Sequence, residues 1–449
     1  MPPQKSKLKI VIIAILILVI IGFIAYYFFF GRNKGSVSVV PANDSQVTFT
    51  IGNQDIGINQ GTGVSTSTSA NTSSGQTIVT GSGIIPKLRK ISANPVAGAI
   101  AKKIVVDTKV STIVRYIERA TGNVYETDTN SWNLKRISNT TIPKIVEAIW
   151  GKDANSLYIR RILDGTEDIE TYYARLRPGT TTKILSLGAT EEEVVNPDSL
   201  MTLEGVYLPR NIEELSINNA GNKLFYFTEK VGRGVGVVSD VNGLKGVEVF
   251  NSPLSDFQIS WPKEDTLTFT TRPSGVEDGF FYFGNSGGAK LQKLFGNILG
   301  LTTLTSPNAQ MVLLGESSGN GYNLGLFDVK KKTREPLSLN TLPEKCVWSA
   351  LNLSLIYCAV PSVLPLALYP DSWYQGLVSF SDEIWRINTE TGENKLIAKP
   401  KDLSGGDEVD ATKLFLDPDE NYLFFTNKKN SSFWSLKLSE SVATTSATE

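Results

Sequence analysis

Residues 348–358 read WSALNLSLIYC, and their layout recurs along the chain: a large apolar anchor, a polar turn, and an apolar strand that begins seven residues after the anchor. Close copies are INNAGNKLFYF at 217–227 and LTSPNAQMVLL at 304–314. The anchors of all the copies are Val106, Trp150, Ile217, Trp261 (with one residue fewer), Leu304, Trp348 and Leu416. Short apolar runs separated by Gly, Asn, Asp and Pro turns predict an all-β chain.

The anchors recur at a nearly fixed period. Successive spacings are 44, 67, 44, 43, 44 and 68 residues, so four of the six intervals agree within one residue. The two longer intervals indicate one insertion each. A period of about 40 to 50 residues with four strand-like pieces per unit is typical of propeller blades. Seven anchors therefore predict a seven-bladed β-propeller over residues 87–438.

The last repeat stops after three strands, at residues 432–438. An unpaired outer strand edge there promotes aggregation. The segment KLRKIS at 87–92, just before the first repeat, resembles fourth strands of other repeats such as NLKRIS at 133–138. We therefore predict that residues 87–92 supply the missing strand and close the ring.

Together, the anchor, its polar turn and the turn TETGE at 389–393 resemble the WD40-like repeats of TolB-type propellers. They are also similar to PQQ-type repeats, whose turn often carries a Thr-Gly pair such as Thr391 and Gly392. The resemblance covers residues 87–438 and implies the fold. It supplies no catalytic motif, and the turn Pro418, Asp419, Glu420 departs from the family's Pro-Asp-Gly.

The second insertion, residues 361–382, is rich in aromatic and aliphatic residues and is placed between the second and third strands of the Trp348 blade. Exposed aromatic clusters favour contacts with partners. The candidate binding residues are Tyr369, Trp373, Tyr374 and Phe380. The alternative is that the insertion folds over the rim or the central channel and buries its own aromatic rings.

The first insertion, residues 188–210, is placed after the fourth strand of the Trp150 blade. In a four-stranded meander that connection lies on the same rim as a connection between second and third strands, so both insertions are expected to share one rim. Its carboxylates attract a cation or a basic partner, or form a solvated acidic loop. They are Glu191, Glu192, Glu193, Asp198 and Glu204.

Two cysteines, Cys346 and Cys358, flank a hairpin whose midpoint is Asn352, so they are expected to face one another across two strands. The same register pairs Trp348 with Ile356. A disulfide is one interpretation and a pair of buried thiols is the other.

Residues 10–30, IVIIAILILVIIGFIAYYFFF, are 21 uncharged positions, long enough to cross a bilayer as a helix. The basic segment 1–9 carries Lys5, Lys7 and Lys9, which favours a cytoplasmic N-terminus. The aromatic end of the run favours an uncleaved signal anchor over a cleaved signal peptide. We therefore expect a single-pass protein of the cell membrane with an extracytoplasmic propeller; a reversed topology is the alternative.

Two stretches are predicted to lack fixed structure. The linker at 31–86 includes residues 61–83, which hold six Ser, six Thr and five Gly. Such a stretch cannot bury enough apolar surface to offset chain entropy. Residues 439–449 have the composition of a frayed tail.

The chain of 449 residues has 44 Lys and Arg against 45 Asp and Glu, and no His. The balanced charge argues against a nucleic-acid partner. The absence of His excludes Ser-His-Asp and Cys-His catalysis and His-ligated metals. We expect no cofactor and no metal. The predicted function is a membrane-anchored binding or scaffold module with a protein or envelope-polymer partner; the alternative is a carboxylate-dependent envelope hydrolase or lyase acting at the central channel.

Overall fold

A computed structural model describes residues 78–79, 83–106, 108–183, 192–195, 199–288, 290–319 and 321–438. The predicted membrane segment at 10–30, the basic segment 1–9 and the tail at 439–449 lie outside these residues, as does the linker except for 78–79 and 83–86. None of the helices in the described part of the chain is long and apolar enough to cross a bilayer.

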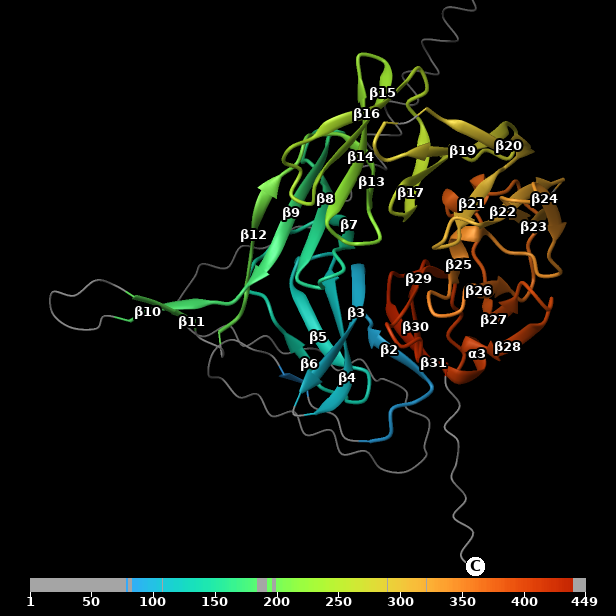
Figure 1. Ribbon diagram of the computed structural model, residues 1–449. Helices are drawn as coiled ribbons and strands as arrows, with labels where there is room; N and C mark the ends of the chain where they lie inside the picture. Colours follow the sequence, from blue (N-terminus) through green and yellow to red (C-terminus); the bar gives the residue numbers. More distant parts are fainter. Residues whose placement is uncertain are drawn as a thin grey trace, which may run out of the picture. The chain divides into compact units, whose positions relative to one another are not determined.

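Within the described residues, seven antiparallel sheets form the blades of a propeller (Figure 1). The strands of the first three blades are β3 (Val96–Val106), β4 (Lys109–Glu118), β5 (Val124–Asp128) and β6 (Leu134–Arg136); β7 (Ile145–Trp150), β8 (Ser156–Ile162), β9 (Ile169–Arg177) and β12 (Thr202–Tyr207); and β13 (Ile212–Ile217), β14 (Lys223–Lys230), β15 (Arg233–Asp240) and β16 (Val247–Ser252). A short strand, β1 (Ile78–Val79), pairs with β6 and adds a fifth strand to the first blade.

The next three blades follow the same meander. Their strands are β17 (Phe257–Lys263), β18 (Thr266–Thr271), β19 (Asp278–Asn285) and β20 (Gln292–Leu299); β21 (Thr302–Thr305), β22 (Met311–Ser318), β23 (Gly321–Asp328) and β24 (Thr333–Pro336); and β25 (Cys346–Trp348), β26 (Leu355–Pro361), β27 (Asp382–Asn388) and β28 (Asn394–Ala398). Three single-turn helices lie in connections: η1 (Pro343–Lys345), α2 (Asp371–Tyr374) and α3 (Pro400–Leu403).

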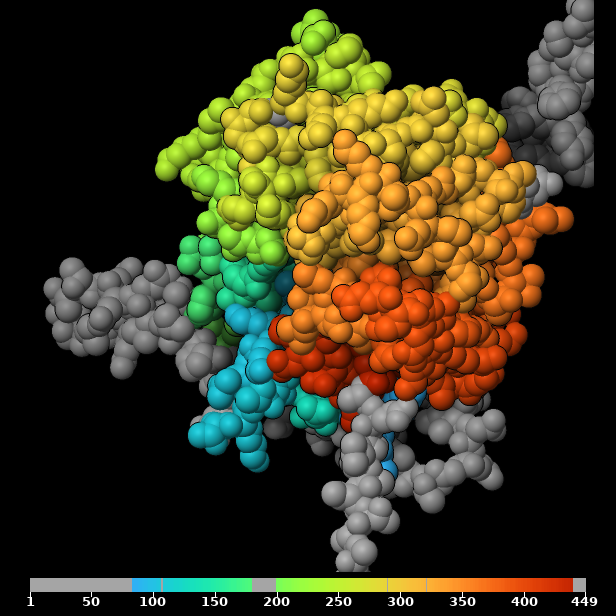
Figure 2. Space-filling model, turned by 45° about the vertical axis from the view of Figure 1, so that its right-hand side comes forward, coloured from blue at the N-terminus to red at the C-terminus, as the bar shows by residue number. Residues whose placement is uncertain are grey.

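The seventh blade closes the ring as the sequence predicts. It consists of β29 (Ala411–Leu416), β30 (Tyr422–Asn427), β31 (Phe433–Lys437) and, from the start of the described chain, β2 (Leu88–Ser92). Strand β2 pairs antiparallel with β31, with Leu88 opposite Leu436. Figure 2 shows the early, cyan segments in contact with the red seventh blade. The prediction of a closure strand at 87–92 is confirmed.

The core lies between blades. The second strand of each blade buries side chains on both faces of the sheet, because a neighbouring blade packs against each face. The second strand β14, for example, buries the five residues from Leu224 to Thr228. Seven apolar clusters among the described residues each join neighbouring blades, and one of them joins the seventh blade to the first through Phe433 and Tyr116. The prediction of seven blades is therefore confirmed.

The meander gives the ring two rims. Connections between second and third strands, and those from one blade to the next, lie on what we call the cap rim. Connections between first and second strands, and between third and fourth, lie on the opposite rim. Because β2 runs antiparallel to β31, the chain enters β2 at Leu88 and leaves β31 at Lys437 on the opposite rim.

The predicted position of the first insertion is wrong. The fourth strand of the second blade is β12, at residues 202–207, which pairs with β9. The insertion therefore precedes this strand and lies on the opposite rim, where β10 (Thr180–Lys183) pairs with β11 (Glu192–Val195). The two insertions do not share a rim.

A glycine explains the choice of fourth strand. A Cβ at Gly205 would lie 1.7 Å from the Tyr173 carbonyl oxygen, so only glycine lets β12 approach β9 this closely. The segment that precedes residue 188 and β12 both have the mixed polar and apolar pattern of a fourth strand. Periodicity alone therefore does not show which of the two segments is the fourth strand. Of the acidic candidates, Glu204 lies exposed in β12 and Glu192 and Glu193 lie in β11, whereas Glu191 and Asp198 are outside the described residues.

Candidate functional site: a cap on one rim

The second insertion forms a compact cap on the cap rim. It connects β26 to β27, the second and third strands of the sixth blade, as predicted. We use "the cap" for residues 362–381. Within the cap, α2 follows Pro370, and Gly376, with φ of +75°, reverses the chain soon after the helix ends.

Three of the four predicted binding residues are buried. Tyr369, Trp373 and Phe380 form an apolar cluster with Tyr322 and Leu342 of the propeller, and the rings of Trp373 and Phe380 stack at an interplanar angle of 8°. These three side chains are out of reach of a partner in this arrangement, which corresponds to the packed alternative for the insertion. Tyr374 is the exception, with 38% of its surface exposed.

The cap touches several blades along the cap rim. The Asp371 carboxylate accepts a hydrogen bond from the Gly275 backbone N–H of the fourth blade, at 2.6 Å. On the other side, Lys428 of the seventh blade donates to the Trp373 carbonyl oxygen at 2.7 Å. The Tyr374 hydroxyl donates to the carboxylate of Glu344, in the connection between the fifth and sixth blades. These contacts fix the cap to the ring.

A fully buried ion cluster lies beneath the cap. The Lys345 ammonium lies 2.7 Å from Asp382 Oδ2 and 2.6 Å from Asp410 Oδ1, and all three side chains are at most 1% exposed. Asp410 also accepts hydrogen bonds from the Trp373 indole at 3.0 Å and from the Phe380 backbone N–H at 3.1 Å. The cap and the ion cluster therefore hold each other in place.

Burial raises the pKa values of acidic groups around the cap. Desolvation raises the pKa of Asp382 to about 6, although Lys345 opposes this shift; the Asp410 charge adds to it. Desolvation also raises the pKa of Glu344. Burial, followed by the neighbouring Glu344 charge, raises the pKa of the Tyr374 hydroxyl. These acids are weaker than their exposed counterparts.

Sequence reasoning missed the Lys345 cluster, because its members are 37 and 65 residues apart in the chain. Each lies at or next to the first residue of a strand: Lys345 before β25, Asp382 in β27 and Asp410 before β29. A charged residue bordering a strongly apolar strand is the one signal that the sequence offers for such a cluster.

The outer surface of the cap is apolar. Its exposed large side chains are Val363, Leu366, Leu368, Tyr374 and Leu377, of which Leu366 is 84% and Leu377 is 73% exposed. Exposed Val276 continues this surface onto the fourth blade, since a Cβ on its neighbour Gly275 would lie 2.7 Å from the Leu368 side chain. We call these six residues the cap patch. Large exposed apolar side chains gathered on one segment favour contacts with a partner.

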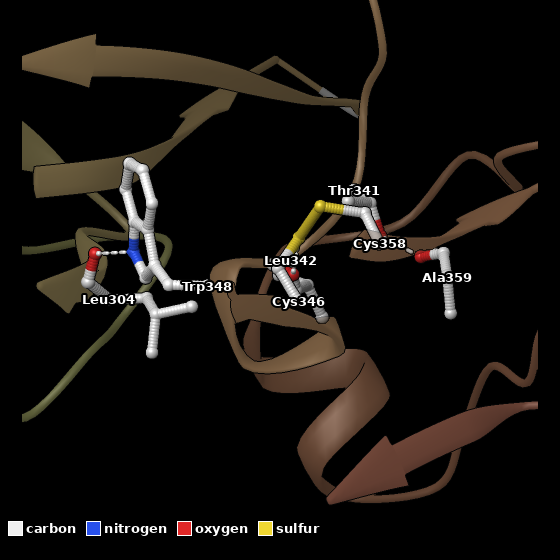
Figure 3. Close-up of a disulfide and its surroundings, with 7 residues drawn as sticks. All are labelled: Leu304, Thr341, Leu342, Cys346, Trp348, Cys358 and Ala359. Carbon is white, nitrogen blue, oxygen red and sulfur yellow. Dashed lines mark hydrogen bonds between the residues drawn. A yellow bond between two sulfur atoms is a disulfide. The ribbon is translucent and has the colours of Figure 1, made fainter. Parts of the chain in front are cut away.

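A disulfide joins Cys346 to Cys358 at the base of the sixth blade (Figure 3). The two residues are directly opposite in β25 and β26, and Trp348 is opposite Ile356, which is the register that the sequence predicts. The Trp348 indole next to this bridge donates to the Leu304 carbonyl oxygen at 3.2 Å. The bridge therefore links β25 covalently to β26, the strand that leads into the cap.

A second ionic cluster joins Glu147, Glu214 and Lys413, on first strands, which face the axis of the ring, to Arg160 on the second strand β8. Glu147 accepts hydrogen bonds from Arg160 at 2.9 Å and from Lys413 at 3.3 Å. Although burial opposes it, the charges of Lys413 and Arg160 lower the pKa of Glu147. Burial raises the pKa of Glu214 to about 7 despite Arg160, and the Glu147 charge contributes. Glu214 therefore holds its proton to a higher pH than Glu147.

No protein-family model and no curated protein sequence matches the chain. Among solved structures, the chain is similar to an oligogalacturonate lyase from Vibrio parahaemolyticus (TM-score 0.45, 10% identity, 78% of this chain and 99% of that chain). It is also similar to an oligogalacturonate lyase in complex with manganese (TM-score 0.47, 12% identity, 80% and 99%) and to TolB from Acinetobacter baumannii (TM-score 0.38, 12% identity, 66% and 78%).

Proposed function

We propose that this protein is a membrane-anchored, extracytoplasmic binding module whose cap patch contacts a protein or polymer of the cell envelope. The observation that carries the proposal is the exposed apolar surface of the cap, which is held over a buried ion cluster. Apolar side chains in contact with water are an unfavourable surface unless a partner covers them.

The rigidity of the cap favours specific binding. Leu366, Leu368 and Leu377 belong to the same short segment as the buried rings of Tyr369, Trp373 and Phe380. The contacts of the cap to the fourth and seventh blades restrict its movement. A surface that is ordered before binding loses less conformational entropy when a partner docks.

Two observations support the extracytoplasmic location. Residues 10–30 have the length and flanking charges of a signal anchor. The Cys346–Cys358 disulfide is of a kind that persists in oxidising compartments and is rare in the cytosol. The chain enters β2 on the opposite rim, so the cap patch lies on the rim away from the point where the linker joins the propeller.

Crosslinking and pull-down from native membranes test the binding proposal. The test variant carries Leu366→Glu and Leu377→Glu, which place charge in the cap patch. The matched control carries Leu244→Glu and Leu351→Glu, two exposed leucines on the opposite rim. We expect the first variant to lose a partner that the wild type and the control retain. Equal recovery of every partner by both variants contradicts the proposal.

Protease accessibility tests the location. A tag placed after residue 449 should be digested when protease is added to intact cells and protected when the membrane orientation is inverted. The reverse pattern contradicts an extracytoplasmic propeller. A membrane protein with a cytoplasmic domain serves as the control, because that domain should be protected in intact cells and digested in the inverted preparation.

The second candidate function is a carboxylate-dependent hydrolase or lyase at the ring axis. The observation that favours it is the pairing of Glu214, whose pKa is raised to about 7, with ionised Glu147. Two carboxyl groups in different protonation states supply a general acid and a base or nucleophile. The test is hydrolysis of envelope glycans and peptides by the wild type, with Glu214→Gln as the control variant; turnover that survives the substitution contradicts this assignment.

A further inference from the structure

The Lys345 cluster brings together one amine and two carboxyl groups, which can react with each other as well as form a salt bridge. Its amine nitrogen lies 2.7 Å from Asp382 Oδ2, so the nitrogen is already in hydrogen-bond contact with the carboxyl group. A second carboxylate, Asp410, contacts the same nitrogen at 2.6 Å. Groups held in contact in this way react with effective molarities on the order of 10⁵ to 10⁸ M when their orientation is suitable.

The two aspartates are bonded differently. Asp410 accepts hydrogen bonds from Trp373, Phe380 and the ammonium of Lys345. Asp382 Oδ1 is buried and has no hydrogen-bond partner in the described structure. Burial raises the pKa of Asp382 to about 6, so this carboxyl group holds its proton more readily than an exposed aspartate. Asp382 is therefore suited to be an electrophile and Asp410 a base.

The other oxygen of Asp382 has a donor in place. Asp382 Oδ2 accepts a hydrogen bond from the Ala411 backbone N–H at 2.6 Å. Attack on the carboxyl carbon places negative charge on this oxygen. A backbone N–H aimed at the oxygen stabilises that charge as an oxyanion hole does.

Aromatic rings enclose the cluster. The Lys345 nitrogen lies 5.3 Å from the Trp373 ring centroid and 5.0 Å from that of Phe380. Charges buried in apolar surroundings carry a large desolvation cost. A condensation that converts the ammonium and the Asp382 acid into a neutral amide, and leaves a proton on Asp410, removes both buried charges and this cost; the enclosure excludes the water that would reverse it.

We propose that Lys345 and Asp382 condense to form an intramolecular amide cross-link. Asp410 takes a proton from the Lys345 ammonium, and the free amine attacks Asp382 Cγ while the Ala411 N–H holds Oδ2. The Nζ–Cγ bond forms, the Cγ–Oδ1 bond breaks, and Oδ1 leaves as water. Of the four protons on the ammonium and the Asp382 acid, one stays on the amide, two leave with water and one remains on Asp410. No oxidant or cofactor takes part.

The cross-link closes a covalent loop around the cap. Residues 345 and 382 flank the second strand and the whole cap, and the Cys346–Cys358 disulfide lies inside the same loop. The cap then stays attached at its base even when the surrounding hydrogen bonds open. This inference does not depend on the partner or on the location proposed above.

Peptide mapping of the full-length protein, reduced and alkylated, tests the cross-link. We expect the protein to be lighter than its sequence by one water molecule. Trypsin should fail to cleave after Lys345, and a branched peptide should contain both Lys345 and Asp382. A sequence mass with cleavage after Lys345 overturns the proposal, as does a loss of water confined to a linear peptide or a branch at Asp410.

Variants assign the roles without depending on stability. Asp382→Asn should lose ammonia in place of water, because the amine then displaces the amide nitrogen. Asp410→Asn should reduce the cross-linked fraction at least tenfold, and Lys345→Arg should abolish it. Lys428→Arg, which changes a neighbouring lysine that contacts the Trp373 carbonyl oxygen, should leave the cross-link intact. Full cross-linking in Asp410→Asn or Lys345→Arg contradicts the mechanism.

Discussion

The Trp348 indole nitrogen lies 3.2 Å from the Leu304 carbonyl oxygen, so the anchor of the sixth blade is hydrogen-bonded to the anchor of the fifth. The two residues occupy equivalent positions in successive repeats, 44 residues apart. This pair of anchors thus joins the fifth blade to the sixth.

The first prediction concerns this bond. Trp348→Phe leaves the partly buried Leu304 carbonyl without its donor and shrinks a buried ring, so we expect a loss of about 1–3 kcal/mol in the free energy of unfolding. Urea unfolding measures the change. Trp385→Phe is the control, because the Trp385 indole bonds to Glu383 within its own strand and is only partly buried. An equal loss in both variants would show that the bond between anchors has no special role.

The second prediction concerns ring closure. A chain that begins at residue 94 lacks β2 and exposes the edge of β31, whereas one that begins at residue 76 retains β2. We expect the shorter chain to aggregate and to melt at a lower temperature, because an open edge pairs with other chains. Light scattering and thermal unfolding compare the two; the same melting temperature for both would contradict a role for β2 in stability.

The third prediction concerns the base of the cap. Trp373 is 4% exposed and donates to Asp410, so Trp373→Ala should cost about 3–5 kcal/mol in stability. Leu377→Ala, in the same segment but exposed, is the control and should cost under about 0.5 kcal/mol. Chemical denaturation measures both. If Trp373→Ala unfolds at the wild-type denaturant concentration, the cap is not packed as described.

The fourth prediction concerns pH. Burial raises the pKa of Glu214 to about 7 in the folded protein, above its ordinary value of 4.5. The folded state therefore binds a proton that the unfolded state has released between these values, and stability falls as the pH rises from about 4.5 to 7. Glu214→Gln should flatten this slope and stabilise the protein at pH 8. Exposed Glu335→Gln should leave the slope unchanged. Because Asp382 also has a raised pKa, some slope should remain in Glu214→Gln, and a slope equal to that of the wild type contradicts the assignment.

The fifth prediction concerns the disulfide. The bridge closes a loop of about 13 residues, and in the chain-entropy model its removal costs about 3 kcal/mol. We expect Cys346→Ala with Cys358→Ala to lower stability by about this amount, and reductant to have no further effect on that variant. Urea unfolding with and without reductant measures both. Alkylation of both thiols in unreduced wild-type protein would contradict the bridge.

Much of the fold could be predicted because it rests on local periodicity. The anchors, the hairpin register at Cys346 and the strand at 87–92 all follow from patterns within a few residues of one another. The fourth strand of the second blade could not be chosen in this way. Its identity depends on the close approach of Gly205 to Tyr173, which is a contact between strands.

The site was harder to predict than the fold. Sequence composition identified the aromatic residues of the cap but not which of them are buried, because burial depends on Lys345 and Asp410 from distant segments. Tyr374 stays exposed because its ring lies outside the buried cluster of Trp373 and Phe380. A charged cluster assembled from three distant segments leaves almost no trace in the local pattern.

The antiparallel pairing of β2 with β31 also determines how the propeller responds to mechanical tension. A pull between the upstream chain at Leu88 and a partner held on the cap rim acts along the axis of β2. The hydrogen bonds of that strand pair are then strained in parallel, as in shearing, and do not open one after another, as in peeling. In the proposed arrangement of a membrane anchor and a partner on the cap patch, the seventh blade would transmit force between the two.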